Sequence, residues 1–141
     1  MRVTDTKPFP DLEAGLVEWA ATTVPGLIST DSRVRYKHVG DELPSEYAKR
    51  LPFAEVEVRG GPTDGLSWHA EVGVHMFASS RAEAGRVLRD MFARMGVYPR
   101  HFGGVVVDSV EVTVYPSRSK NQEPDEDTTC FYGEMQISLR R

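Results

Sequence analysis

Four segments of the chain alternate between apolar and polar residues, and this pattern constrains the fold more than any other feature. Phe53 to Arg59 carries apolar side chains at positions 54, 56 and 58, and Trp68 to Met76 carries them at every even position. Val105 to Tyr115 and Thr129 to Leu139 alternate in the same way. A period of two residues is typical of β-strands with one buried face. Residues 60–65, Gly-Gly-Pro-Thr-Asp-Gly, can only form a turn, so we expect the segments to make two hairpins.

A helical stripe separates the two hairpins. Ser80 and Glu83 have the spacing of a capping box, and Gly96 is placed to end the helix. Between them, apolar residues recur with helical spacing at Ala84, Val87, Leu88, Met91, Phe92 and Met95. A shorter helix is predicted over residues 11–23, with Asp11 as its N-cap and Leu12, Leu16, Trp19 and Ala20 on one face.

These elements predict an α+β fold: a four-stranded antiparallel sheet, made of two hairpins, with two main helices packed on one face. We expect residues 1–10 to form an N-terminal arm and residues 11–141 a single domain. In the second hairpin the alternation assigns Val106, Val110, Val112 and Val114 to one side of a strand. Between residues 27 and 52, Leu27-Ile28 and Val34-x-Tyr36 are candidate strands and Ser45 to Arg50 is a candidate helical turn.

Composition excludes several classes of function. The formal net charge of -4 argues against a module that grips nucleic acid, although it suits a surface past which DNA slides. Mild acidity is also ordinary for a soluble protein. The single cysteine can form neither an internal disulfide nor a cysteine-based zinc site. Because no run of about 20 apolar residues and no secretory signal is present, we expect a protein made in a cytoplasm, without membrane contact.

No segment predicts an active site. His69, Glu71 and His75 share the polar face of a strand, but His75 lies about 20 Å from His69, too far to bind the same metal. We therefore expect this face to be a sheet surface or a subunit interface. Cys130 lacks a nucleophile motif and is predicted to be a half-exposed thiol. The pairs Gly60-Gly61 and Gly103-Gly104 fit turns, not phosphate-binding loops. No catalytic residue, metal or cofactor is predicted.

Two charged segments are candidates for binding a partner. A basic cluster on or just beyond the second helix consists of Arg86, Arg89, Arg94 and Arg100. Such a face is by default solvated; the alternatives are salt bridges at an interface and, last, contact with the DNA backbone. The connection from Pro116 to Asp127 exceeds an ordinary hairpin loop and is a candidate docking element. Its charged residues are Arg118 and Lys120, followed by Glu123, Asp125, Glu126 and Asp127.

Three short signatures resemble one family. They are the opening helix Asp11-Leu-Glu-Ala-Gly-Leu-Val-Glu-Trp19, the run Leu51-Pro-Phe that leads through a strand to Gly60-Gly61, and Phe77-Ala-Ser-Ser-Arg-Ala-Glu-Ala84. The order and spacing of these signatures resemble those of tail terminator (tail completion) proteins of long-tailed bacteriophages, particularly phages of actinobacteria. The likeness spans residues 11–139.

The resemblance implies a structural virion protein at the head-proximal end of a phage tail, assembled in the host cytoplasm. Members form a hexameric ring that caps the tail tube, stops its polymerisation and binds the head–tail connector, while genomic DNA passes through the lumen without sequence-specific binding. Members are not enzymes and need no cofactor. On this reading Arg86, Arg89, Phe77 and Tyr132 are candidate interface residues, and the loop 116–127 is a candidate lumen or docking loop. The alternatives are a head–tail connector (stopper) or minor tail protein, and, from another class, a small metal-dependent enzyme or ligand-binding domain using His69 and Glu71.

Overall fold

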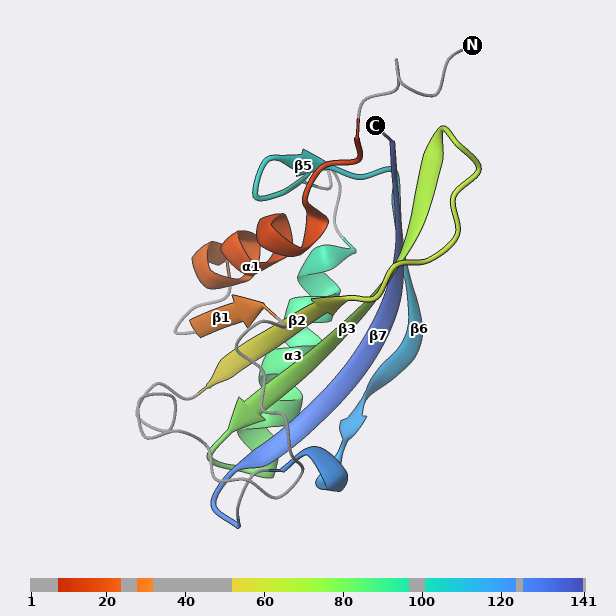
Figure 1. Cartoon of the computed structure of the whole chain (residues 1–141). Helices are drawn as coiled ribbons and strands as arrows, with labels where there is room; N and C mark the ends of the chain where they lie inside the picture. Colours follow the sequence, from red (N-terminus) through yellow and green to blue (C-terminus); the bar gives the residue numbers. More distant parts are fainter. Residues whose placement is uncertain (1–7, 24–27, 32–51, 97–100, 124–125, 141) are drawn as a thin grey trace.

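The computed structural model describes residues 8–23, 28–31, 52–96, 101–123 and 126–140 (Figure 1). The elements, in chain order, are α1 (Leu12–Thr23), β1 (Ile28–Asp31), β2 (Phe53–Val58), β3 (Ser67–Ala78), α3 (Arg81–Met95), β4 (His101–Phe102), β5 (Val105–Val106), β6 (Ser109–Arg118), the 3-10 turn η3 (Lys120–Gln122) and β7 (Thr129–Arg140). None of these helices is long and apolar enough to span a membrane.

The predicted antiparallel sheet is confirmed. The strand order is β1-β2-β3-β7-β6, and the last four strands are antiparallel to one another wherever they pair. The two hairpins join through β3 and β7, which pair along twelve residues from Ser67 opposite Arg140 to Ala78 opposite Thr129. Strand β1 extends the sheet by running parallel to β2. The other elements suggested between residues 27 and 52 lie outside the described residues.

Both predicted helices are confirmed, and their caps form as the sequence indicates. Asp11 Oδ1 accepts a hydrogen bond from the Ala14 N–H at 3.1 Å, and Ser80 Oγ accepts one from the Glu83 N–H at 3.1 Å. All six residues of the apolar stripe in α3 are buried, and Leu12, Leu16 and Ala20 of α1 join the same core. Helix α1 packs over β1 and β2, while α3 packs over β3, β7 and β6.

A glycine under α3 fixes how closely the helix approaches the sheet. Gly133 of β7 lies beneath Phe92, and a Cβ atom at this position would be only 2.7 Å from two carbons of the Phe92 ring. Since carbon atoms in contact sit about 3.5–4.0 Å apart, only glycine lets the ring rest on the strand.

The predicted turn between β2 and β3 is confirmed. It forms a short extension of the hairpin. Backbone hydrogen bonds continue beyond the strands, including those from the His69 N–H to Pro62 O and from the Asp64 N–H to Ser67 O. The carboxylate of Asp64 accepts from the N–H groups of Leu66 and Ser67. This turn leaves Leu66 largely exposed at its tip.

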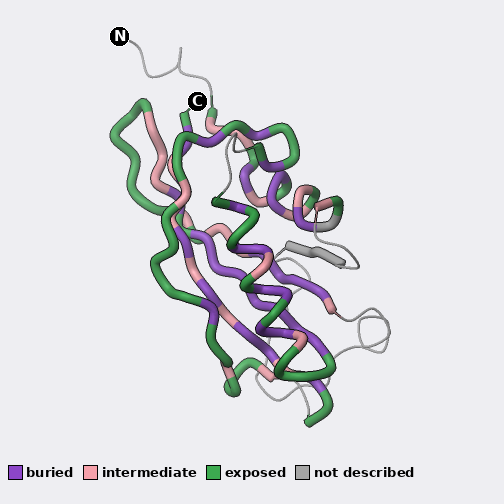
Figure 2. Tube along the Cα trace, turned by 180° about the vertical axis from the view of Figure 1, so that it is seen from behind, coloured by how far each residue is buried: buried purple, intermediate pink, exposed green. Residues whose placement is uncertain are grey.

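The prediction for the second hairpin is wrong in part. Residues 105–115 do not form one strand: β5 ends at Val106 and pairs with β4, and β6 begins at Ser109. Strand β6 is an outer strand of the sheet, and its register shifts between Val112 and Val114 and again before Ser117. Val106, Val112 and Val114 are consequently exposed, and Val105 and Val107 are buried instead. Figure 2, coloured by burial, shows β6 as a largely exposed strand.

Candidate functional site

The most distinctive surface lies where α3 meets the outer strand β6. An open groove of about 640 Å³ runs between them. Its lining residues are Arg81, Ala82, Arg89, Pro116, Ser117, Arg118 and Phe131. We call this groove, together with the exposed Val112, Val114 and Tyr115 of β6, the α3–β6 edge. It combines an apolar floor with arginine side chains drawn from a helix and a strand.

The arginines of the helix carry charge that the described part of the chain does not neutralise. Arg81, Arg86 and Arg89 are exposed, and among the described residues no ion pair involves any of them. By contrast, Arg94 pairs with Asp90 at 3.0 Å. The predicted basic face is therefore divided: Arg81 and Arg89 line the groove, Arg86 lies outside it, and Arg94 is already paired. Arg100 lies outside the described residues.

Arg89 is held close to the floor of the groove. A Cβ atom at Gly85 would be 2.8 Å from Arg89 Nη1 and 2.9 Å from Phe131 Cε2. The guanidinium and the aromatic ring thus both lie against the helix at a position where a side chain would displace them. Gly85 is buried by these two neighbours, and the Arg89 charge is presented beside an apolar surface.

The strand side of the α3–β6 edge is unusually apolar for an exposed sheet edge. Val112, Val114 and Tyr115 are 44%, 38% and 67% exposed. Outer strands offer unpaired backbone groups to other chains, and the register shifts in β6 limit unregulated pairing of this kind. Arginine and tyrosine are enriched at protein interfaces. The edge therefore has a composition that resembles that of a protein interface.

The opposite face of the sheet carries the predicted row of polar residues. His69 lies opposite Ser138, Glu71 opposite Gln136 and His75 opposite Tyr132, so His69, Glu71 and His75 share one face as predicted. His69 Nδ1 lies 2.8 Å from Ser138 Oγ. Among the described residues no group of three or more His, Cys, Asp or Glu side chains is placed to hold a metal ion.

Part of this face is buried, whereas the alternating pattern predicts that the polar face of each strand is exposed to solvent. Glu55 and Phe77 are each only 3% exposed, and the Phe77 ring stacks on Phe53 with centroids 4.9 Å apart. His75 is also buried, with Nδ1 3.7 Å from Glu55 Oε1. The prediction that Phe77 is an exposed interface residue is therefore wrong. An alternating pattern identifies the two faces of a strand but does not reveal whether a second layer covers one of them.

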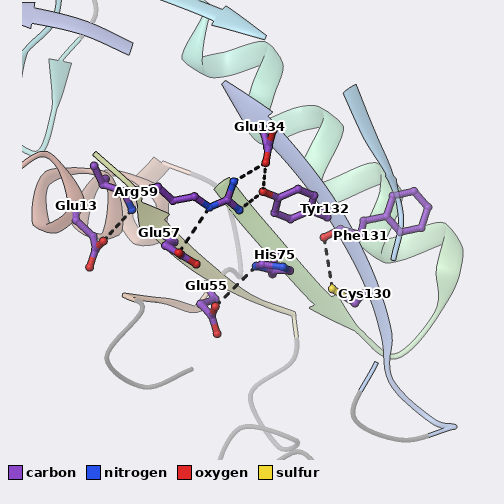
Figure 3. A network of polar contacts seen from close by, with 10 residues as sticks. Glu13, Glu55, Glu57, Arg59, His75, Cys130, Phe131, Tyr132 and Glu134 are labelled. Carbon is purple, nitrogen blue, oxygen red and sulfur yellow. Dashed lines mark hydrogen bonds and ion pairs between the residues drawn. The ribbon is translucent and has the colours of Figure 1, made fainter. Parts of the chain in front are cut away.

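Tyr132, the other predicted interface aromatic, belongs to a polar network (Figure 3). The Arg59 guanidinium donates to the Tyr132 hydroxyl and to the Glu134 carboxylate, and Arg59 Nε lies 3.6 Å from Glu57 Oε1. Burial, together with the hydrogen bond to Glu134, raises the pKa of Tyr132 to about 12. The hydrogen bond from Tyr132, followed by that from Arg59, lowers the pKa of Glu134. Arg59 and Glu134 are thus paired with each other within the chain, and their network stabilises this face of the sheet.

The predicted docking loop is shorter than the sequence indicates. Residues 116–118 belong to β6, and Arg118 makes two hydrogen bonds to the Glu123 carboxylate, at 3.0 and 3.1 Å. Glu123 Oε2 also accepts from the Cys130 N–H at 3.0 Å. Arg118 and Glu123 therefore fasten the loop to β7, while Lys120, Glu126 and Asp127 remain exposed. Asp125 lies outside the described residues.

Cys130 is fully buried, so the prediction of a half-exposed thiol is wrong. It lies opposite Phe77 in the register of β3 and β7, on the part of the polar face that is buried. Burial raises the pKa of the thiol, and the Glu123 and Glu55 charges raise it further. A buried thiol that stays protonated is a poor nucleophile and a poor metal ligand.

Comparisons with known proteins do not place the chain in a family. No protein-family model matches the sequence, and no curated protein matches it either. The sequence analysis did not predict two features of the surface: the position of Arg81 in the groove, without an ion pair in the part of the chain that the structure describes, and the network of Arg59, Tyr132 and Glu134. Alternation does place residues 132 and 134 on one face of a strand, but joining Arg59 to them requires the register of three strands.

Proposed function

We propose that the chain is a structural protein of a bacteriophage tail, a tail terminator. In this role, copies assemble into a ring that caps the tail tube, stops its polymerisation and joins the tail to the head connector. The observation that carries the proposal is the α3–β6 edge, where exposed apolar residues of an outer strand lie beside arginines without ion pairs among the described residues. Such a surface is a liability in a monomer and useful in an assembly.

The family signatures support the same function through their places in the fold. The first forms α1 with its Asp11 cap, and the second leads into β2. The third joins the end of β3 to the capped start of α3, so its Arg81 lines the groove. The third signature and the candidate interface thus share a residue in the first turn of α3. A net charge of -4 is compatible with a ring through which DNA passes without adhering.

The alternatives draw less support from the described residues. His69 lies against Ser138, and no third ligand joins His69 and Glu71, so a metal-dependent enzyme has no described centre. Metal analysis of the purified protein tests that alternative directly, and stoichiometric zinc would revive it.

Deleting the gene from the phage that encodes the chain tests the proposal. We expect filled heads without tails, together with tails of abnormal length, and restoration of both defects by the wild-type gene supplied in trans. Tails of uniform, normal length that fail to join heads would indicate a head–tail connector instead. Heads carrying tails with a defective distal tip would indicate a minor tail protein.

A further inference from the structure

We propose that the groove of the α3–β6 edge receives the acidic outer face of helix α1 from a second copy of the chain. This inference rests on the proposed function, because it identifies the contact between neighbouring subunits of the proposed ring.

The two surfaces lie at opposite sides of one molecule. Strands β1 and β6 are the outer strands of the sheet; α1 packs over β1 and β2, and the groove lies beside β6 (Figure 1). One copy therefore cannot bring its own α1 into its own groove. A contact between two different patches repeats from copy to copy, and it forms a closed ring when the rotation between copies closes.

The charges of the two surfaces are complementary. Helix α1 contains two glutamates and no Lys, Arg or His. Its exposed residues Asp11, Ala14, Glu18 and Thr22 follow one another at helical spacing, so they form one outer stripe. In the groove, Arg81 and Arg89 have no ion pair among the described residues. Complementary charges of this kind select a partner and fix its register.

The spacing of the charges also agrees. Asp11 and Glu18 are seven positions apart, about 10 Å along a helix, and Arg81 and Arg89 are eight positions apart, about 12 Å. Ala14 lies between the two acidic residues, and its small side chain allows the stripe to approach the groove closely. Glu18, and the Asp11 carboxylate oxygen that does not accept from the Ala14 N–H, can then each face one arginine of the next copy.

Phosphate groups of DNA also match arginine, but the surroundings of the groove favour a protein partner. Its floor contains the buried Phe131 and Pro116, and the apolar Val114 and Tyr115 continue along the same strand. The third arginine of the groove, Arg118, is already engaged by Glu123. The exposed acidic residues Glu126 and Asp127 follow in the same connection. A groove that combines apolar side chains with two arginines lacking ion pairs among the described residues fits a protein surface better than a phosphate backbone.

Cross-linking between copies tests the contact. Because Cys130 is buried, a thiol introduced on the surface is the reactive one. A Glu18→Cys variant and an Arg89→Cys variant are mixed, allowed to assemble in solution or on tail tubes, and treated with a short bismaleimide. We expect cross-linked dimers that contain one copy of each variant. The matched control replaces Arg89→Cys with Arg94→Cys, because Arg94 pairs with Asp90 and does not line the groove; we expect no dimers there.

Charge reversal gives a second readout. We expect Arg89→Glu to raise the protein concentration needed for assembly about tenfold, Arg94→Glu to leave it unchanged, and Glu18→Arg combined with Arg89→Glu to restore assembly. Rings that form normally in Arg89→Glu, without the Glu18–Arg89 cross-link, would overturn this inference and leave the proposed function standing. Loss of DNA retention in such rings would assign the groove to nucleic acid. Failure of the wild-type chain to form rings, in solution and on tail tubes alike, would overturn the proposed function itself.

Discussion

Substituting Gly133 by alanine tests how α3 packs on the sheet. The added methyl carbon would lie 2.7 Å from the Cε2 and Cζ atoms of Phe92 and 3.2 Å from Val114 O. The Phe92 ring must then move by about 1 Å to regain ordinary contact distances, and it is buried beside other core residues. Overpacking of this kind costs about 1–3 kcal/mol, while replacing glycine in a strand gains about 0.5–1 kcal/mol.

The net expectation is that Gly133→Ala lowers the free energy of unfolding by up to about 2.5 kcal/mol, with a central value of about 1 kcal/mol. For a chain of this length, this corresponds to a fall in Tm of up to roughly 8 °C. Urea titration of the wild type and the variant, followed by circular dichroism, gives the free energy directly. The dependence of the unfolding free energy on urea concentration should stay unchanged, because the surface exposed on unfolding is nearly the same.

A second substitution shows whether the loss comes from Phe92. Phe92→Leu removes the ring carbons that the new methyl group meets, so Gly133→Ala should cost at least about 1 kcal/mol less in the Phe92→Leu background. Equal costs in both backgrounds would refute the packing of Phe92 on Gly133.

Three further predictions concern the helix cap, the thiol and the polar network. Ser80→Ala should lower the free energy of unfolding by about 1 kcal/mol in urea titrations, because Ser80 caps α3, whereas Ser79→Ala should have little effect. Cys130 should react with a thiol reagent only after unfolding in urea, since burial raises its pKa; rapid labelling of the native protein would contradict this. Glu134 has a lowered pKa, so its carboxylate stabilises the fold above the ordinary value of 4.5, and this contribution is lost as pH falls through the folded-state pKa. Glu134→Gln should therefore be less stable than the wild type at pH 7, and the difference should shrink towards pH 3.

The sequence predicts the elements whose signals are local. The period of two residues finds the strands of both hairpins, and the period of 3.6 finds α3 together with its Ser80 cap. Each of these patterns arises within one element, where side-chain direction follows directly from backbone geometry. The pairing of the two hairpins through β3 and β7 can also be expected, because both strands are long and apolar on one face, and each has one edge that its own hairpin leaves unpaired.

The errors arise where burial depends on neighbours distant in the sequence. Val112 and Val114 have the pattern of a core strand, yet β6 lies at the edge of the sheet and its register shifts leave them exposed. Phe77 and Cys130 alternate as surface residues, yet they are buried on the second face. For the same reason, the sequence indicates that α3 has a basic outer face but not that Arg81 and Arg89 line a groove with Phe131.

The most direct test of the central claim is a cryo-EM map of the tail of the phage that encodes this chain. The account predicts a ring of copies of this fold at the head-proximal end of the tail tube, in contact with the head connector, with α1 of each copy in the α3–β6 edge of the next. Density for the chain at the distal tip of the tail, or its absence from the tail, would contradict it.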